Sequence, residues 1–274
     1  MADDLAVNKI FHDHECAYYD ERFVIVHDQR SALRAVRDTE DLLSRPLRPG
    51  ERVLDVGCGT GWLAAGLVRA RPDLRLLGMD LSAGMLSRAR AAGAWPLVQA
   101  DAAHLPLPDS CLDLIVARGV LHHLGDVGAA LAEWRRVLLP AGAVVLTSEP
   151  TPAVDRHAGR LVPVLLALVR RPLSAEEDFW EVASMAANLH VFTPAQLSGL
   201  AHTAGFGTAR LAGAGWLSTL LLTTSYVLHG RRRGLARRIP WRSLERVAAA
   251  FDRLVTARLV PERLRHTVVG VLRP

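Results

Sequence analysis

The sequence predicts an α/β fold built on a parallel sheet, and two observations lead to it. Short apolar runs alternate with amphipathic segments of helical period through the first half of the chain, and glycines or acidic residues follow three of those runs. Strands that alternate with helices in this way form parallel sheets with right-handed crossovers, and their ligands bind beyond the carboxyl ends of the strands. Half of the 274 residues are hydrophobic and 22% are charged, which excludes a disordered or fibrous chain.

The expected elements follow one another between residues 52 and 147. Residues 52–57 form the first strand, and residues 62–70 form a helix because apolar side chains recur there at helical spacing and Pro72 ends the run. Ser82 is the expected cap of the next helix, which runs to about residue 92. The other elements of this part are strands over 74–79, 95–100, 112–117 and 143–147 and a helix over 127–139.

The first strand ends in a glycine-rich turn. Gly57, Gly59 and Gly61 let the backbone turn tightly and approach a ligand without interference from a Cβ atom. A dinucleotide-binding fingerprint would need a glycine at position 62, where this chain has Trp62. Asp55, two residues before the first glycine, would repel a pyrophosphate. The turn therefore suits a ligand that carries a cationic amino group.

Acidic residues also end the next two strands. Asp80 stands 23 residues after Gly57, where a carboxylate can accept hydrogen bonds from both hydroxyls of a ribose. Asp101, followed by Ala102, supplies an acceptor for the exocyclic amine of an adenine. Each acid alone is more often a helix cap than a ligand group, but three such features on three successive strands favour a shared binding site.

Four segments together resemble the class I S-adenosylmethionine-dependent methyltransferases, within the small-molecule group of the ubiquinone and menaquinone methyltransferases (methyltransferase type 11). They are VLDVGCGTGWLA at 53–64, LLGMDLSAGMLSRAR at 76–90, QADAAHLPLPDSCLDLIVARGVLHHL at 99–124 and EWRRVLLPAGAVVLTSEP at 133–150, and residues 192–211 resemble the late helix of that family more weakly. The resemblance implies a Rossmann-like, seven-stranded, mostly parallel sheet with helices on both faces, a final antiparallel strand and extra helical cap insertions. It also implies S-adenosyl-L-methionine as cofactor, with S-adenosyl-L-homocysteine as product.

The resemblance assigns cofactor contacts position by position. Gly57 and Gly59 would pass beneath the methionine part and Asp55 would lie near its amino group, while Asp80 would hold the ribose. Leu81 and Met85 would lie beside the adenine, whose edge Asp101 and Ala102 would contact, and Arg118 and Gly119 would close the floor of the pocket. The full set of expected cofactor-binding residues is Asp55, Gly57, Cys58, Gly59, Asp80, Leu81, Met85, Asp101, Ala102, Arg118, Gly119 and Tyr18.

The family fold implies a single domain with additions to a minimal core. Strands at 208–214 and 266–272 would form the final hairpin. The additions between the minimal elements have mostly helical sequence patterns. Such additions would cover the active site and choose the substrate. The expected parts are an N-terminal helical lid at 1–45, the cofactor-binding core at 46–150, a helical cap insertion at 151–190, the late helix and strand at 191–215, a basic helical insertion at 216–265 and the final strand at 266–274.

Methyl transfer asks for few catalytic groups. The methyl carbon of a sulfonium is already electrophilic, so displacement needs an in-line nucleophile shielded from water. A base would help an oxygen or nitrogen nucleophile that loses a proton. The candidates are His123 and His122 after the fourth strand, or a group at 12–20 that includes His14 and Tyr19, while His123 could instead only shape the pocket.

The group at 12–20 also bears on a metal site. If this segment is one helix, His14 and Tyr18 share a face, and Glu15 and Tyr19 share the neighbouring one. No metal site is expected, because His12 and His14 do not share a helix face and no matched Cys or His pair completes a set of ligands.

The basic charge lies mainly in the second half of the chain. Residues 1–150 carry a net charge of −4, residues 151–274 carry +9, and residues 210–274 alone carry +10. Solvated helix faces explain this best, with an anionic substrate or peripheral contact with a membrane as alternatives. Nucleic acid is not expected, because no Asn/Asp-Pro-Pro-Tyr/Phe motif follows the fourth strand and only 5% of the residues are aromatic. The uncharged stretch 211–228 is at the lower length limit for a membrane-spanning helix, and the preferred interpretation is a buried strand followed by a helix.

Location and role are predicted only in outline. Cys16, Cys58 and Cys111 form no paired motif and the first residues are polar and acidic, so a cytoplasmic location is expected. The predicted function is transfer of a methyl group to O, N or C of a small organic substrate, in natural-product biosynthesis. The main alternative is an enzyme of the same fold that binds the same cofactor but catalyses a non-methylating reaction such as cyclisation. The pattern does not predict the oligomeric state.

Overall fold

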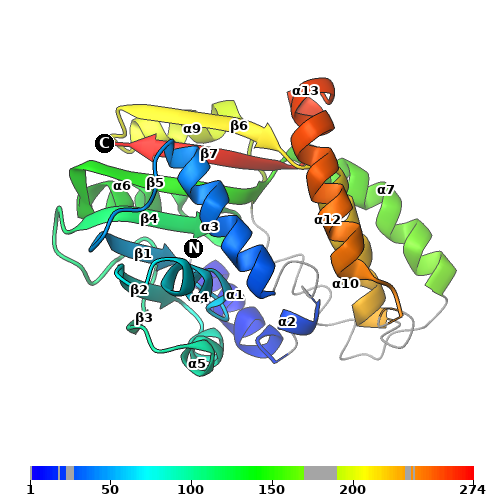
Figure 1. Ribbon diagram of the computed structural model, residues 1–274, viewed down its shortest axis with the longest axis horizontal. Helices are drawn as coiled ribbons and strands as arrows, with labels where there is room; N and C mark the ends of the chain where they lie inside the picture. Colours follow the sequence, from blue (N-terminus) through cyan, green and yellow to red (C-terminus); the bar gives the residue numbers. More distant parts are fainter. Residues whose placement is uncertain (1, 18, 23–27, 170–189, 232–235, 237) are drawn as a thin grey trace.

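The computed structural model describes residues 2–17, 19–22, 28–169, 190–231, 236 and 238–274 (Figure 1). Among these residues, seven strands form one sheet in the order β3-β2-β1-β4-β5-β7-β6. Strands β1 to β5 pair in parallel, whereas β7 is antiparallel to both of its neighbours. This topology confirms the predicted fold class. The strands are β1 (Arg52–Val56), β2 (Arg75–Asp80), β3 (Leu97–Gln99), β4 (Leu112–Arg118), β5 (Leu138–Pro150), β6 (Thr208–Ala214) and β7 (Thr267–Arg273).

Helices cover both faces of the sheet. On one face, α3 packs on α4 and α4 contacts α5, while on the other face α6 packs on α9. Asp28 caps the start of α3 in a reciprocal pair with Ser31, and Ser82 caps α5 as predicted. These helices are α3 (Gln29–Leu43), α4 (Trp62–Ala70), α5 (Ala83–Ala92), α6 (Val127–Val137) and α9 (Pro194–Thr203).

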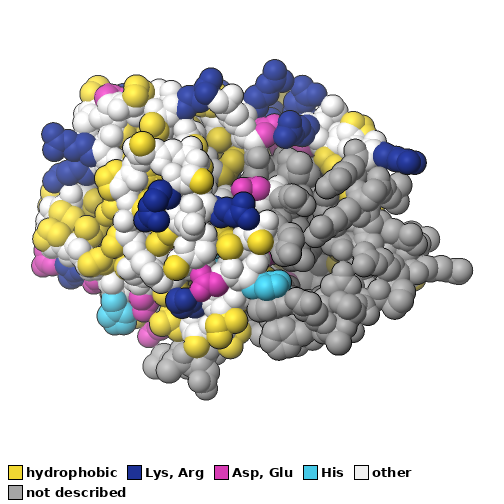
Figure 2. Space-filling view, turned by 90° about the horizontal axis from the view of Figure 1, so that it is seen from below, with side chains coloured by type: hydrophobic (Ala, Val, Ile, Leu, Met, Phe, Trp, Pro, Cys, Tyr) yellow, Lys and Arg dark blue, Asp and Glu magenta, His cyan; other side chains and the backbone are white. Residues whose placement is uncertain are grey.

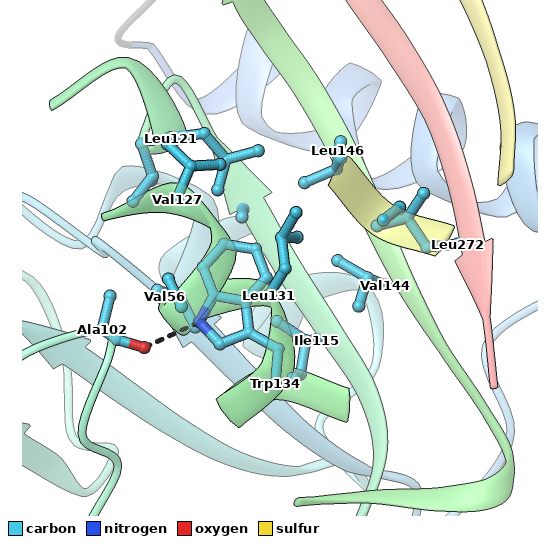
Figure 3. Close-up of a cluster of buried hydrophobic side chains, with 14 of the residues drawn as sticks. Val56, Ala102, Ile115, Leu121, Val127, Leu131, Trp134, Val144, Leu146 and Leu272 are labelled. Atoms are coloured by element: carbon cyan, nitrogen blue, oxygen red, sulfur yellow. Dashed lines mark hydrogen bonds between the residues drawn. The ribbon is translucent and has the colours of Figure 1, made fainter. Parts of the chain in front are cut away.

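A large apolar cluster fills the space between the sheet and α6 (Figure 3). Trp134 of α6 is fully buried there among side chains such as Ile115 and Leu131, and its indole Nε1 donates a hydrogen bond to the carbonyl of Ala102 at 3.0 Å. A buried indole N–H needs such a partner, because leaving it unpaired would cost free energy. The bond therefore holds the turn after β3 on the core.

A second group of helices lies beyond the carboxyl ends of the strands, to the right in Figure 1. There α10 packs against both α7 and α12. The stretch 211–228 forms the end of β6 and most of α10, as preferred on the sequence, and no described helix is long and apolar enough to cross a bilayer. The group consists of α7 (Pro152–Val169), α10 (Leu217–Arg231), α12 (Trp241–Phe251), a π turn (Asp252–Thr256), α13 (Ala257–Leu259) and the 3₁₀ turn Glu262–Leu264.

Three segments differ most from the predicted boundaries. Strand β3 is shorter than expected. Strand β5 starts earlier than expected, at Leu138, because Leu138 already pairs with Leu112 ahead of an irregularity in the register. The N-terminal segment is not one helix: α1 (Ala2–Glu15) ends before α2 (Tyr19–Arg22). The shared face of Glu15 and Tyr19, expected only if this segment were one helix, is therefore not formed, and Tyr18 lies outside the described residues.

Candidate functional site

The carboxyl ends of β1, β2 and β4 meet beneath the N-terminal segment. The Thr60 hydroxyl in the turn after β1 donates to Asp20 Oδ1 of α2 at 2.8 Å. Asp13 of α1 accepts hydrogen bonds from the Ser82 hydroxyl at 2.5 Å and from the Gly84 N–H at 3.0 Å, after β2. Asn8 donates to the carbonyl of His123, after β4, at 2.9 Å. The segment α1–α2 is thus bonded to all three strand ends.

The glycine-rich turn after β1 has the conformation that its sequence predicts. Gly57 has φ +63°, and a Cβ atom there would lie 2.6 Å from a methyl of Val120. Gly59 has φ +55°, and a Cβ atom there would meet nothing within 4 Å. Both positions favour glycine for their backbone angle. Gly57 allows close packing on the loop after β4, whereas Gly59 leaves open space in which a ligand can approach the backbone.

Asp80 joins the turns after β1 and β2. Its Oδ2 accepts the Gly59 N–H at 2.8 Å and its Oδ1 accepts the Ser82 N–H at 2.9 Å. Burial raises the pKa of Asp80, and these backbone hydrogen bonds oppose the rise. Each carboxylate oxygen keeps a further lone pair for a hydroxyl donor. Two acceptors at a fixed spacing match the two hydroxyls of a ribose.

Two buried side chains, one acidic and one basic, keep polar atoms without hydrogen-bond partners in the described part of the chain, at the ends of neighbouring strands. Asp55 is 2% exposed and its Oδ2 has no hydrogen-bond partner among the described residues. Burial, with the negative charge of Asp80 as a second cause, raises the pKa of Asp55 to about 8.

Arg118 is the positive member of this pair. It lies 5.0 Å from the ring of Trp62 and makes no hydrogen bond or ion pair with the residues that the structure describes, and burial lowers its pKa. In the register Asp55 pairs with Val116, two residues before Arg118, so all three side chains lie on one face of the sheet. Buried unpaired charges are costly, and this arrangement can receive a group that carries both signs.

The other expected adenine-side residues take up different environments. The Cys58 side chain packs with Leu86 and Ala89, so Cys58 can meet a ligand only through its backbone. Met85 is buried in the first turn of α5, and Leu81 is half-buried with its carbonyl accepting a hydrogen bond from Gln99 Nε2 at 2.9 Å.

Asp101 serves its own turn. Its Oδ1 accepts the Ala103 N–H at 2.9 Å and its Oδ2 lies 3.0 Å from His104 Nδ1. Ala102 is buried and is held by the bond from Trp134. Both carboxylate oxygens of Asp101 therefore have protein partners, so a contact with an adenine amine would use their remaining lone pairs.

Glu149, which the sequence analysis did not single out, organises the loop after β4. It is fully buried at the end of β5 and accepts the N–H groups of Val120, Leu121 and His122 at 2.8, 3.1 and 3.2 Å. Its Oε2 also lies 3.0 Å from His122 Nδ1. An ionised carboxylate offers only acceptors, so Nδ1 donates and His122 Nε2 is left as the basic nitrogen. The strand-end position that identified Asp80 would also have found Glu149.

His123 and His12 lie beside His122. The rings of His122 and His123 are 3.9 Å apart, and the ring of His12 packs edge-on against His123 at 4.8 Å. Burial, followed by the charge of His122, lowers the pKa of His12 to about 4, so His12 is neutral at pH 7. The described residues hold no group of three or more His, Cys, Asp or Glu side chains arranged for a metal ion.

The two N-terminal catalytic candidates lie on different helices, His14 on α1 and Tyr19 at the start of α2. Burial raises the pKa of Tyr19, with the negative charge of Glu15 as the next cause. His14 is half-buried on α1. Asp20, next to Tyr19, bonds to the turn after β1, so Tyr19, His122 and His123 lie at one end of the sheet.

Comparison with known proteins identifies the region that carries this site. A family model described as a methyltransferase domain matches residues 54–146, and a model of protein-L-isoaspartate(D-aspartate) O-methyltransferase matches residues 7–92. A malonyl-[acyl-carrier protein] O-methyltransferase of Legionella pneumophila is 36% identical over 101 residues, which are 35% of this chain and 36% of that protein. A demethylmenaquinone methyltransferase of Geobacillus kaustophilus is 33% identical over 145 residues, or 49% and 60% of the two chains.

The chain thus spans only about a third of the first of these relatives. Two solved structures share the fold over more of the chain. Phosphoethanolamine N-methyltransferase 2 of Haemonchus contortus, in complex with S-adenosyl-L-methionine, has a TM-score of 0.60 at 15% identity and covers 95% of this chain and 57% of that one. A [4+2]-cyclase has a TM-score of 0.56 at 21% identity over 89% and 82% of the two chains. At these identities the structural likeness establishes the fold alone.

Proposed function

We propose that residues 54–146, which match a methyltransferase domain model, form a class I S-adenosylmethionine-dependent methyltransferase domain, and that the chain uses it to transfer a methyl group to O, N or C of a small organic molecule. One observation carries the proposal: the free Oδ2 of Asp55 and the guanidinium of Arg118 lie at the ends of β1 and β4, and Asp80 ends the neighbouring strand β2. The methionine end of the donor carries an ammonium and a carboxylate, and its ribose carries two hydroxyls. The protein offers a partner for each of these groups.

The fit to the donor can be followed residue by residue. Asp55 would accept from the ammonium and Arg118 would donate to the carboxylate, which would give the free Oδ2 of Asp55 and the buried guanidinium their partners. Asp80 would accept from the ribose hydroxyls, and the turn at Gly59 leaves room for the donor to lie against the backbone. Asp101 and Ala102 stay the proposed contacts of the adenine edge.

The donor supplies an electrophilic methyl carbon when it is bound, so the protein has to position the acceptor and exclude water. The segment α1–α2 spans the strand ends through Asn8, Asp13 and Asp20, and it is the proposed lid. We propose His122 as the base that takes the acceptor's proton at Nε2, with Glu149 holding its ring. His123, His14 and Tyr19 stay candidates for contact with the acceptor.

The helices outside the core are proposed to select the acceptor. The insertions at 151–190 and 216–265 contribute α7, α10 and α12, which lie beyond the carboxyl ends of the strands (Figure 1). Relatives of the core act on chemically different molecules, as the names malonyl-[acyl-carrier protein] and demethylmenaquinone methyltransferase state. We therefore propose a small organic acceptor and a role in natural-product biosynthesis. The likeness to a cyclase keeps a non-methylating reaction as the second candidate.

A single experiment separates the two candidates. The protein is incubated with S-adenosyl-L-methionine carrying an isotope-labelled methyl group and a library of small organic acceptors, and the products are followed by mass spectrometry. We expect labelled methyl in one acceptor and an equal amount of S-adenosyl-L-homocysteine. Tight binding of the donor by calorimetry, together with conversion of an acceptor without donor consumption, would establish the non-methylating alternative instead.

A further inference from the structure

The outer surface of α12, the π turn and α13 exposes aliphatic side chains along one continuous helical segment. Leu244, Val247, Leu254 and Leu259 are 41%, 66%, 62% and 77% exposed. They are half of the large hydrophobic side chains that are exposed in the part of the chain that the structure describes. Spacings of three and seven residues place the first three on one side of the helix. We call the outward side of residues 242–259 the α12–α13 face.

The acidic residues of this segment are all turned toward the protein. Glu245 is buried and pairs with Arg34 of α3 at 2.7 Å. Asp252 caps α10 by accepting the N–H groups of Leu217 and Ser218, each at 3.0 Å. Their negative charges are therefore used inside the fold and are absent from the α12–α13 face.

The arginines of the same segment point outward. Arg242, Arg246, Arg253 and Arg258 are exposed. Arg242 approaches Asp28 only at 3.6 Å, and Arg246 donates to the Ser243 hydroxyl at 3.1 Å. The α12–α13 face thus combines aliphatic side chains with positive charge and has no acidic counter-charge of its own.

From this combination we propose that the α12–α13 face docks on the surface of an anionic lipid bilayer. A helix whose exposed side carries leucines flanked by arginines lies in the interface, with aliphatic groups among the acyl chains and guanidinium groups at anionic headgroups. The segment is held rigidly, because Glu245 ties it to α3 and Asp252 ties it to α10. The chain offers a preformed platform rather than a loop that must fold on binding.

A nucleic acid fits this surface less well. Phosphate recognition uses a basic groove with stacking aromatic rings, and it gains nothing from exposed leucines. Figure 2 shows another side of the molecule, where Lys and Arg side chains are interspersed with apolar and acidic ones over the described residues instead of forming a continuous basic stripe. The α12–α13 face differs in having its positive charge next to exposed aliphatic groups, with no acidic residue of its own segment exposed beside them.

Vesicle co-sedimentation of the full chain tests the proposal. We expect binding to vesicles of phosphatidylcholine mixed with phosphatidylserine and no binding to phosphatidylcholine alone. The triple variant Leu244→Ser, Val247→Ser, Leu254→Ser and the double variant Arg246→Gln, Arg258→Gln should each lower the bound fraction at least about tenfold. Matched controls elsewhere are Val164→Ser on α7 and the double variant Arg75→Gln, Arg90→Gln, all at exposed positions, which should bind as the parent does.

Three results would overturn the proposal that the α12–α13 face docks on a bilayer. One is absence of binding to phosphatidylserine vesicles by the parent chain. Another is equal loss in the control variants, which would indicate general charge attraction. A third is a parent chain that elutes as a dimer when the triple variant elutes as a monomer, because the face would then bind a second copy. Circular dichroism and donor binding confirm that each variant is folded, and neither readout depends on the proposed bilayer contact.

Discussion

The strand ends of the sheet and the helices beyond them handle charge in opposite ways. At the strand ends, Asp55 Oδ2 has no hydrogen-bond partner and the buried Arg118 makes no ion pair within the described residues, so a ligand can supply what the protein does not. On α12 and the π turn, Glu245 and Asp252 are satisfied within the protein, and the arginines are exposed. Buried polar groups without partners indicate a small-molecule site at the strand ends. Exposed arginines beside aliphatic side chains indicate a docking surface on the α12–α13 face.

The largest effect is expected at His122. Replacement by alanine removes the proposed base, and we expect kcat for an oxygen or nitrogen acceptor to fall about 10²–10⁴-fold. Steady-state kinetics on the acceptor that the labelling experiment identifies measures it. The control is His202→Gln on α9, where the imidazole bonds only to the Phe206 carbonyl of the neighbouring loop. An unchanged kcat in the His122 variant would remove this histidine from the mechanism.

Glu149 acts through His122, so its variant separates positioning from chemistry. In Glu149→Gln the amide oxygen can still accept from the Val120 and Leu121 N–H groups, but the NH₂ group that replaces Oε2 cannot accept from His122. The His122 ring then loses the partner that orients it, so we expect kcat for the acceptor to fall with little change in KM. A role limited to holding the loop would instead raise KM and leave kcat where it was.

The next effect is expected at Asp80. Losing two hydrogen bonds from ribose hydroxyls to a charged group should weaken donor binding about 10²-fold or more in Asp80→Ala. Isothermal calorimetry with S-adenosyl-L-methionine measures this. Asp113→Ala is a matched control, since that carboxylate pairs with Arg52 at the opposite end of the strands. Equal affinity in parent and Asp80 variant would contradict the ribose assignment.

Asp55 predicts a smaller effect that depends on pH. Without ligand its pKa is about 8, so below that pH it carries a proton that an ammonium partner would displace. Donor affinity should therefore rise with pH, by up to about tenfold per unit, and level off above the pKa. In Asp55→Asn the affinity should be low and nearly independent of pH. A parent affinity that is flat between about pH 6 and 8 would show that Asp55 does not meet the ammonium.

The strand-end residues were predictable because parallel strands bring their carboxyl ends to one edge of a sheet, which is a local property of the sequence. Asp80 and the glycine turn follow from it. The hydrogen bond from the Gly84 N–H of α5 to Asp13, 71 positions earlier in the chain, does not follow from the local sequence, because it requires α1 to be placed in space. The missing ion pair of Arg118 is likewise invisible in the sequence, since the nearby acidic side chains, Asp38 of α3 and Glu245 of α12, act on it only through their charge.

The smallest effect distinguishes a surface from a core. Leu254→Ala on the α12–α13 face removes a side chain that is mostly exposed, so the free energy of unfolding should change by less than about 0.5 kcal/mol. Leu131→Ala in the buried cluster should cost about 2–5 kcal/mol, because it leaves a cavity around Trp134. Urea denaturation followed by tryptophan fluorescence measures both. If Leu254→Ala cost as much as Leu131→Ala, its leucine would pack within the fold, and the apolar character of the α12–α13 face would have a structural origin instead of marking a docking site.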